Sequence, residues 1–147
     1  MPYTKRKKQD AISTKKIFSI IAVAVGVLSF LLLFANGLSY ENDNIQGYYY
    51  NFNMFKMIFG SEYTGVNPGL LSAFIIMAIG IILAWFMQKS DIVGFISIAF
   101  FVTSAVLWLC TIPLYGNYDA GLGAAAIWLG ILNLVDAILI FVGISYR

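Results

Sequence analysis

Asp136 is the residue of this chain that could most clearly do chemistry, because it places a carboxyl group in an otherwise apolar stretch near the C-terminus. It lies about twelve residues into the last predicted membrane span, which is roughly 18 Å at 1.5 Å per residue and near the bilayer midplane. A carboxylate at this depth costs at least ~2.5–3.5 kcal/mol on insertion scales, so we expect compensation. No Lys or Arg occurs within a predicted span. The remaining ways to compensate are protonation of the carboxyl or binding of a cation.

Polar side chains of the neighbouring spans predict a small site around this carboxyl. Asn133 lies one helical turn before Asp136, and Ser104 and Thr103 fall at the same estimated depth. The same layer also contains Ser29, Gly26 and Gly80. The functional interpretation is a proton-, cation- or ligand-responsive site. The structural alternative is a neutral Asp136 that Ser104 or Asn133 holds by a hydrogen bond, fixing the helix register.

The composition argues against an enzyme. The chain has no histidine, the commonest general base, and its single cysteine, Cys110, can form neither an internal disulfide nor a Cys/His zinc site. An intramembrane aspartyl protease needs two carboxylates that share a proton, whereas the predicted spans contain one. The Gly-x-Gly-Asp signature of presenilin-like proteases is also missing, because Gly121-Leu122-Gly123 is followed by Ala124. We expect no catalytic residues, no metal site and no cofactor.

The class of protein follows from the composition. Apolar residues make up 61% of the 147 residues and charged residues 11%, against roughly 45–50% and about 25% in soluble domains. A soluble globule of this size could not bury so much apolar surface. Disordered chains are excluded because they are poor in aromatics and rich in charge. The chain is therefore predicted to be an integral membrane protein.

A membrane span needs about 20 mainly apolar residues. Four segments qualify, namely 17–35, 70–87, 92–114 and 124–143. The second and third are separated by a few residues and should form a tight hairpin, while residues 36–69 form one long external loop. We predict an all-α fold in which residues 17–147 form a single antiparallel, left-handed four-helix bundle with crossing angles near about +20°. Residues 1–16 form a basic cytoplasmic tail.

The distribution of Lys and Arg predicts the orientation. Eight of the nine basic residues precede the first span or lie on the same side of the membrane, including Lys89 and Arg147. Lys56 is on the opposite side, together with the acidic residues Glu41, Asp43, Glu62 and Asp119. We therefore expect a multi-pass protein of the cell membrane with both termini cytoplasmic.

The N-terminal region allows two alternatives. The basic and apolar stretches followed by Ala35-Asn36-Gly37 could be a cleaved signal peptide. An apolar run of about 19 residues exceeds the usual 7–15 of a signal core, so an uncleaved span is favoured. The basic tail could instead bind nucleic acid. Membrane topology and attraction to anionic headgroups explain a basic segment directly before a span, so we expect no nucleic-acid partner.

Small and polar residues recur at heptad spacing along one face of every span. In lipid, helices associate through close packing of such residues, because hydrophobicity no longer distinguishes inside from outside. We call this set the seam; its members are Ser19, Ala22, Gly26, Ser29, Leu33, Asn36, Ala73, Met77, Gly80, Ala84, Met87, Gly94, Ser97, Phe101, Ser104, Trp108, Thr111, Ala126, Leu129, Asn133, Asp136, Ile140 and Gly143.

The last span tests the seam best, since Asp136 belongs to it. The opposite face of that span is predicted to contact lipid and consists of Ile127, Ile131, Leu134, Val135, Ile138 and Val142. Asp136 should therefore point into the protein. The three tryptophans, Trp85, Trp108 and Trp128, lie toward span ends, where amphipathic rings prefer the membrane interface.

The external loop is too polar to span the membrane but is rich in aromatic residues. Its aromatic side chains include Tyr48, Tyr49, Tyr50, Phe52, Phe55 and Phe59. The pattern favours an extended piece followed by a short amphipathic turn that ends at Gly60. One interpretation is a lid over the outer mouth of the bundle, with its rings at the headgroup level. The other is a partner-binding surface, because exposed aromatic clusters often mark interfaces.

Four spans, internal termini and a dominant first external loop resemble the layout of claudin-like tetraspan proteins. The resemblance is limited to topology, because residues 36–69 contain neither the tryptophans nor the cysteine pair of that family's loop. No paracellular-barrier function is carried over.

These features favour a non-enzymatic membrane protein that acts through association. It would be a homo-oligomer or an accessory subunit of a larger membrane complex, with the lipid bilayer and other membrane subunits or further copies of itself as partners. The alternative is a small transporter or channel component with a proton- or cation-responsive site at Asp136. Four spans are few for a solitary transporter, so this alternative implies an oligomer.

Overall fold

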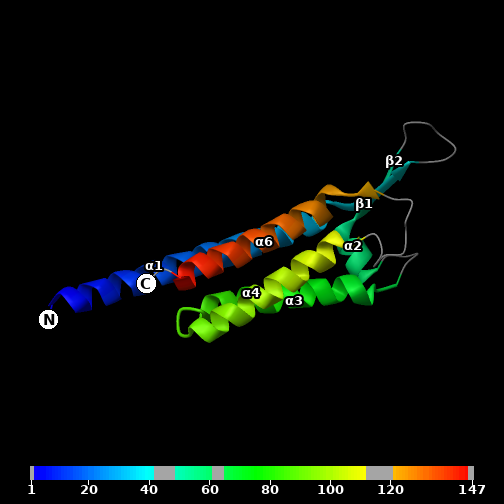
Figure 1. Cartoon of the computed structure of the whole chain (residues 1–147). Helices are drawn as coiled ribbons and strands as arrows, with labels where there is room; N and C mark the ends of the chain where they lie inside the picture. The colour runs from blue at the N-terminus through cyan, green and yellow to red at the C-terminus, as the bar shows by residue number, and fades with distance from the viewer. Residues whose placement is uncertain (1, 42–48, 61–64, 112–120, 146–147) are drawn as a thin grey trace.

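The chain folds into four long helices that lie side by side, with a small sheet at one end (Figure 1). The structure is a computed structural model that describes residues 2–41, 49–60, 65–111 and 121–145. The long helices are α1 (Pro2–Ser29), which the 3₁₀ helix η1 (Phe30–Phe34) extends, α3 (Pro68–Phe86), α4 (Asp91–Leu109) and α6 (Ala124–Ser145).

Four segments in the described part of the chain are long and apolar enough to cross a membrane. They are Thr14–Phe34, Pro68–Phe86, Asp91–Leu109 and Ala124–Ser145. They correspond to the four predicted spans. The third helix ends at Leu109, five residues before the predicted limit of residue 114. The first helix begins well before residue 17, since α1 starts at Pro2 and includes the basic segment.

Successive long helices run in opposite directions, so α1 begins near the end of the bundle at which α6 finishes (Figure 1). Helix α6 packs against α1 and α4, and α3 packs against α4 and α1. The four helices therefore form a closed arrangement with a common interior. α3 and α4 are joined by the short turn after Phe86, which is the tight hairpin that the sequence predicts.

Local sequence signals explain where α3 and the short helix α2 begin and where α2 ends. Asn67 caps α3 by accepting a hydrogen bond from the backbone N–H of Leu70 at 3.1 Å, and Pro68 occupies the first turn, where no N–H is needed. Asn53 caps α2 (Met54–Phe59) in the same way, since its side chain accepts from Phe55 N at 2.9 Å. Helix α2 ends at Gly60, whose φ of 89° suits glycine.

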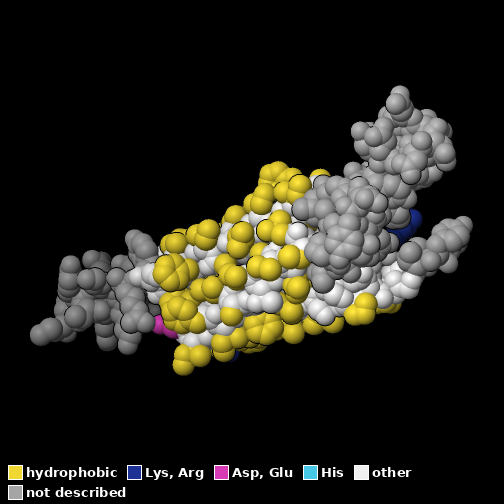
Figure 2. Space-filling model, turned by 45° about the vertical axis from the view of Figure 1, so that its right-hand side comes forward, with side chains coloured by type: hydrophobic (Ala, Val, Ile, Leu, Met, Phe, Trp, Pro, Cys, Tyr) yellow, Lys and Arg dark blue, Asp and Glu magenta, His cyan; other side chains and the backbone are white. Residues whose placement is uncertain are grey.

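The seam lies inside the bundle. Every seam residue whose side chain the structure describes is buried, from Ser19 in α1 to Gly143 in α6. The six residues predicted to line the lipid face of α6 are all exposed, by 37–62%. Both predictions are confirmed. Figure 2 shows hydrophobic side chains spread over the visible side of the helices, as expected of a surface that contacts lipid.

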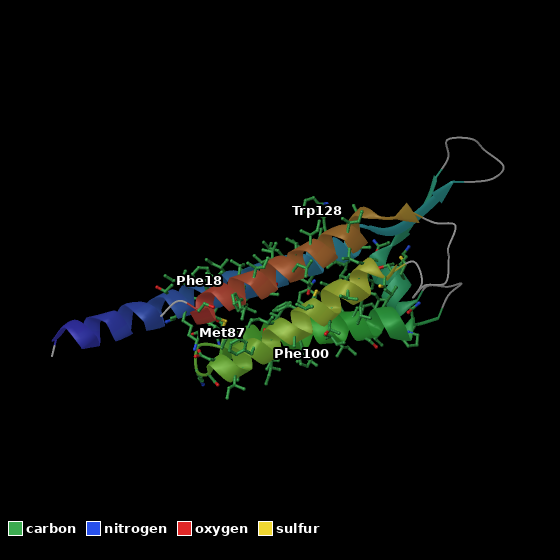
Figure 3. The ribbon with its side chains drawn as sticks, in the orientation of Figure 1. Phe18, Met87, Phe100 and Trp128 are labelled. Carbon is green, nitrogen blue, oxygen red and sulfur yellow. The ribbon has the colours of Figure 1, made fainter. Side chains whose placement is uncertain are left out.

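Glycines allow the helices to approach closely. A Cβ added at Gly143 of α6 would lie 2.8 Å from Phe18 Cβ of α1 and 3.0 Å from Met87 Cε. Figure 3 shows Phe18 and Met87 near the C-terminal end of α6. A Cβ added at Gly94 of α4 would overlap Ile144 Cδ1 of α6. Three helices and the α3–α4 turn therefore meet at positions where a side chain would not fit.

A three-stranded antiparallel sheet lies beyond the ends of the helices. Strand β1 (Asn36–Glu41) pairs with β2 (Tyr49–Asn53) on one side and β3 (Gly121–Leu122) on the other. The all-α prediction did not include these strands. They form because the segments that leave η1 and enter α6 emerge side by side, and their backbone groups can then pair. The extended piece predicted in the loop is β2, and the amphipathic turn that follows is α2.

The close approach at Gly143 gives a test of the packing. We expect Gly143→Val to lower the free energy of unfolding by about 1–3 kcal/mol, because the added side chain overlaps Phe18 and Met87. The same substitution at Gly65 serves as the control, since a Cβ there meets nothing within 4 Å. Thermal unfolding of the purified protein in detergent measures both. Equal stability of the two variants would contradict the packing described above.

Candidate intramembrane polar site

Asp136 lies in the middle of α6, and its side chain is completely buried. It faces α1 at Gly26, where an added Cβ would lie 3.4 Å from Asp136 Oδ2. The same Cβ would lie 2.5 Å from Ile81 Cγ1 of α3. The carboxyl therefore sits where α1, α3 and α6 converge, with apolar groups pressed closely around it.

Neither carboxyl oxygen of Asp136 accepts a hydrogen bond from any group in the described part of the chain. The side chains that were expected to bind it are used elsewhere. Ser104 Oγ donates to the backbone carbonyl of Ala73 in α3 at 3.0 Å. Asn133 Nδ2 donates to Leu129 O at 2.6 Å and to Met77 Sδ at 3.4 Å. The hydrogen bonds required by the structural interpretation are thus not among those formed.

The buried serine hydroxyls of the seam do have partners. Ser97 Oγ donates to Gly80 O at 2.8 Å, which links α4 to α3. Ser29 Oγ donates to Val25 O at 3.0 Å within α1. Ser19 Oγ donates to Ala84 O at 2.7 Å, linking α1 to α3. The unpartnered carboxyl is therefore not a general feature of the core.

Thr103 lies away from Asp136, on the outward surface of α4. Its side chain is exposed and its hydroxyl donates to Ala99 O at 2.8 Å. Thr103 lines a surface groove of about 210 Å³ together with Ile76, Ala99 and Phe100. It was grouped with Ser104 by depth alone, but a step of one residue turns a helical side chain by about 100°. Thr103 cannot therefore contribute to a site in the bundle core.

Apart from Asp136, the charged side chains described in the four helices lie at the ends of the bundle. Lys15 of α1 forms an ion pair with Asp91 at the start of α4. Residues 17–34, in α1 and η1, contain no ionisable side chain, nor do α3 and the part of α4 after Asp91. The helices packed around Asp136 therefore supply no charge to compensate a carboxylate. Whatever neutralises it in this site must come from outside the described residues, as a proton or a bound cation.

Two further buried groups lack hydrogen-bond partners among the described residues, namely Asn133 Oδ1 and Trp108 Nε1. Asn133 was expected in the site, but Trp108 was expected at the membrane interface and is instead completely buried. Trp85 and Trp128 are about half exposed, at 50% and 52%, and their place at the membrane interface stays a prediction. The heptad position of Trp108 within the seam was the signal that it would be buried.

The aromatic residues predicted in the external loop fall into two groups. Tyr48 lies outside the described residues, and Tyr49, Tyr50 and Phe52 belong to β2, where the structure describes only their backbone. The remaining two, Phe55 and Phe59 of α2, are exposed by 42% and 37%.

Phe55 and Phe59 belong to a continuous aromatic row that also contains Phe34, Phe74 and Phe30. Ring centroids are 5.8 Å apart for Phe34 and Phe55, 4.8 Å for Phe55 and Phe59, 5.4 Å for Phe59 and Phe74, and 5.6 Å for Phe30 and Phe74. The opposite side of α2 buries Met54, Met57 and Ile58. Helix α2 thus covers one end of the bundle, beside α3 and η1, and presents aromatic rings outward.

Comparison with known proteins gave no match to a family model, a curated protein or a solved structure. The claudin-like layout therefore remains a similarity of predicted topology.

The lack of hydrogen-bond donors to Asp136 among the described residues predicts that the carboxyl is dispensable for folding. We expect Asp136→Asn, which preserves the side-chain shape, to change the free energy of unfolding by less than about 0.5 kcal/mol or to raise it, because no hydrogen bond is lost. Ser97→Ala, which removes a formed interhelical bond, should lower it by ~0.6 kcal/mol. Thermal unfolding in detergent, in a buffer without sodium, compares the two. A loss of more than about 1.5 kcal/mol in Asp136→Asn would indicate a structural hydrogen bond.

Proposed function

We propose that this protein is a non-enzymatic, multi-pass membrane protein that acts as a small transporter or channel component, with a proton- or cation-responsive site at Asp136. The observation that carries the proposal is the buried carboxyl without a hydrogen-bond partner in the described part of the chain. Ionisable residues inside a membrane are expensive and typically mark ion or proton pathways. A transported or sensed ion would supply the compensation that the described side chains do not.

The packing of the seam changes the balance between the two functions that the sequence suggested. Small residues at heptad spacing favoured association with other helices. In the structure the seam residues whose side chains are described are buried within one chain, so the seam itself is not available to a partner. The buried carboxyl of Asp136 is therefore the stronger evidence, and it favours the transporter or channel function.

The surroundings of Asp136 suggest how binding of a proton or cation to its carboxyl would alter the bundle. Gly26 of α1 and Ile81 of α3 lie against the carboxyl side of α6. Neutralising the carboxylate removes the cost of keeping a charge in this apolar environment. Losing the proton or cation would instead favour separation of α1 from α6, which would admit water to the carboxyl. We therefore expect movement at the contact between α1 and α6 beside Gly26.

We also propose the orientation that the basic residues favour. Lys15, Lys16 and Lys89 lie at the end of the bundle where α1 enters, and Lys56 lies in α2 at the opposite end. The positive-inside rule then gives cytoplasmic termini and an external α2 and sheet. The cell membrane is the proposed location. Because four spans are few for a transporter, a pore or pathway would be completed by further copies or other subunits.

Ion flux tests this function. We expect purified protein in liposomes to give a proton or alkali-cation flux that Asp136→Asn reduces at least ~10-fold, because the neutral amide cannot bind or release a proton. Asp91→Asn is the matched control, since it removes a carboxylate at the end of the bundle rather than in its core. Flux that persists in Asp136→Asn would contradict the proposal.

A second function, as an accessory subunit, is favoured by the aromatic row. Phe34 and Phe55 are 67% and 42% exposed and stack on one another, and rings of this kind often anchor protein interfaces. The row lies at the end of the first span, where it can contact a neighbouring membrane subunit. The same row could serve as a lid at the headgroup level.

Cross-linking in native membranes separates these two roles. If the row is an interface, the double variant Phe55→Ala/Phe59→Ala should lose at least about half of the cross-linked complex, because several interface side chains of this kind cost more than 1 kcal/mol when truncated. Phe141→Ala, at an outward position on α6 that is 55% exposed, is the control. An unchanged complex in the double variant would leave the lid as the role of the row.

A further inference from the structure

Three buried oxygen atoms on one face of α6 have no donor among the described residues. They are Asn133 Oδ1, Asp136 Oδ1 and Asp136 Oδ2. Residues three apart on a helix are neighbours on its surface, with about 5–6 Å between their Cβ atoms. The amide oxygen and the carboxyl therefore belong to one polar patch, and every atom of that patch without a partner is an acceptor.

The orientation of Asn133 is fixed by its own contacts. Its Nδ2 donates to Leu129 O at 2.6 Å and approaches Met77 Sδ at 3.4 Å. Rotating the amide by half a turn would place its oxygen against the Leu129 carbonyl, which is unfavourable because both are acceptors. Oδ1 is therefore held on the side away from these groups, where it could coordinate a cation.

Oxygen acceptors without donors suit a hard cation better than a proton alone. A proton on Asp136 would occupy one carboxyl oxygen and could bridge to at most one further acceptor, which leaves the third oxygen unsatisfied. Hard cations such as alkali and alkaline-earth ions prefer carboxylate and carbonyl oxygens, and one ion can contact several of them at once.

The charge of the site selects a monovalent ion. Asp136 contributes one negative charge, and the helix segments packed around it contain no other ionisable side chain. A monovalent cation makes the site neutral. A divalent cation would leave an uncompensated positive charge in an apolar environment, which costs several kcal/mol.

The packing around the carboxyl favours a small ion. A Cβ at Gly26 would lie 3.4 Å from Asp136 Oδ2 and 2.5 Å from Ile81 Cγ1, so side chains of α3 and α6 already fill the space beside Gly26. An ion that enters must shed most of its water. Sodium fits such a site better than the larger potassium ion.

From these observations we infer that Asp136 and Asn133 form a binding site for a dehydrated sodium ion, with the carboxylate and the amide oxygen as its protein ligands. This inference rests on the proposed function, since it names the ion at the same site. Water or backbone carbonyls would complete the coordination.

Sodium-dependent stability tests the site directly. Purified full-length protein in lipid nanodiscs is unfolded thermally in sodium, potassium or choline chloride at equal ionic strength. We expect saturating sodium to raise Tm by roughly 5 °C over choline, because a ligand that binds only the folded state stabilises it. Asp136→Asn should abolish this rise, and Asn133→Leu should weaken sodium binding at least ~10-fold through loss of one ligand.

Ser97→Ala is the matched control, because it lowers stability at another seam position and should retain the full sodium response. Equilibrium binding of radioactive sodium to the same samples gives a second measurement if a variant is too unstable to unfold cooperatively. An equal response to sodium and potassium, or a sodium response retained in Asp136→Asn, would overturn the sodium site.

A distinct result separates the sodium site from the proposed function. If sodium has no effect but flux and stability respond to pH in the native protein and not in Asp136→Asn, the sodium site is overturned while a proton-responsive function stands. If neither sodium nor pH has an effect that depends on Asp136, both are overturned.

Discussion

Close approach of the helix backbones is the constraint on which the rest of this structure depends. Lipid is as apolar as leucine, so the four helices gain little from hydrophobicity alone and associate where small residues allow dense packing. Gly26, Gly94 and Gly143 lie at such points, each with a side chain of another helix within 3 Å of where a Cβ would be. This packing turns one stripe of every helix inward and leaves the apolar remainder for the bilayer.

The same constraint explains why Asp136 stands out. Serine side chains fit a densely packed seam because their hydroxyls donate to nearby backbone carbonyls, as Ser97 and Ser104 do. A carboxylate can only accept, and helix backbones in the middle of a span have no free N–H to offer it. Packing that satisfies hydroxyls therefore leaves the Asp136 carboxyl and the Asn133 amide oxygen without a donor among the described residues.

Much of this arrangement could be predicted from sequence, because helical periodicity and span length depend on local residue order. The buried seam and the exposed face of α6 follow from that periodicity, as does the inward position of Asp136. The sheet could not be predicted in the same way, since β1 pairs with β3 from a segment about eighty residues away. Thr103 was misplaced because depth was considered without rotation, and the hydrogen bonds of Ser104 and Asn133 depend on neighbouring helices that no local pattern identifies.

The central claim is that the carboxyl of Asp136 exchanges its proton or cation within the bundle core. Infrared difference spectroscopy of the native protein and Asp136→Asn in lipid, recorded as pH and sodium are changed, observes this group directly. The account predicts a carboxyl C=O band or a shift of the carboxylate bands that responds to these changes and is missing from Asp136→Asn. A native spectrum in which no carboxyl signal assigned to Asp136 responds to either change would contradict it.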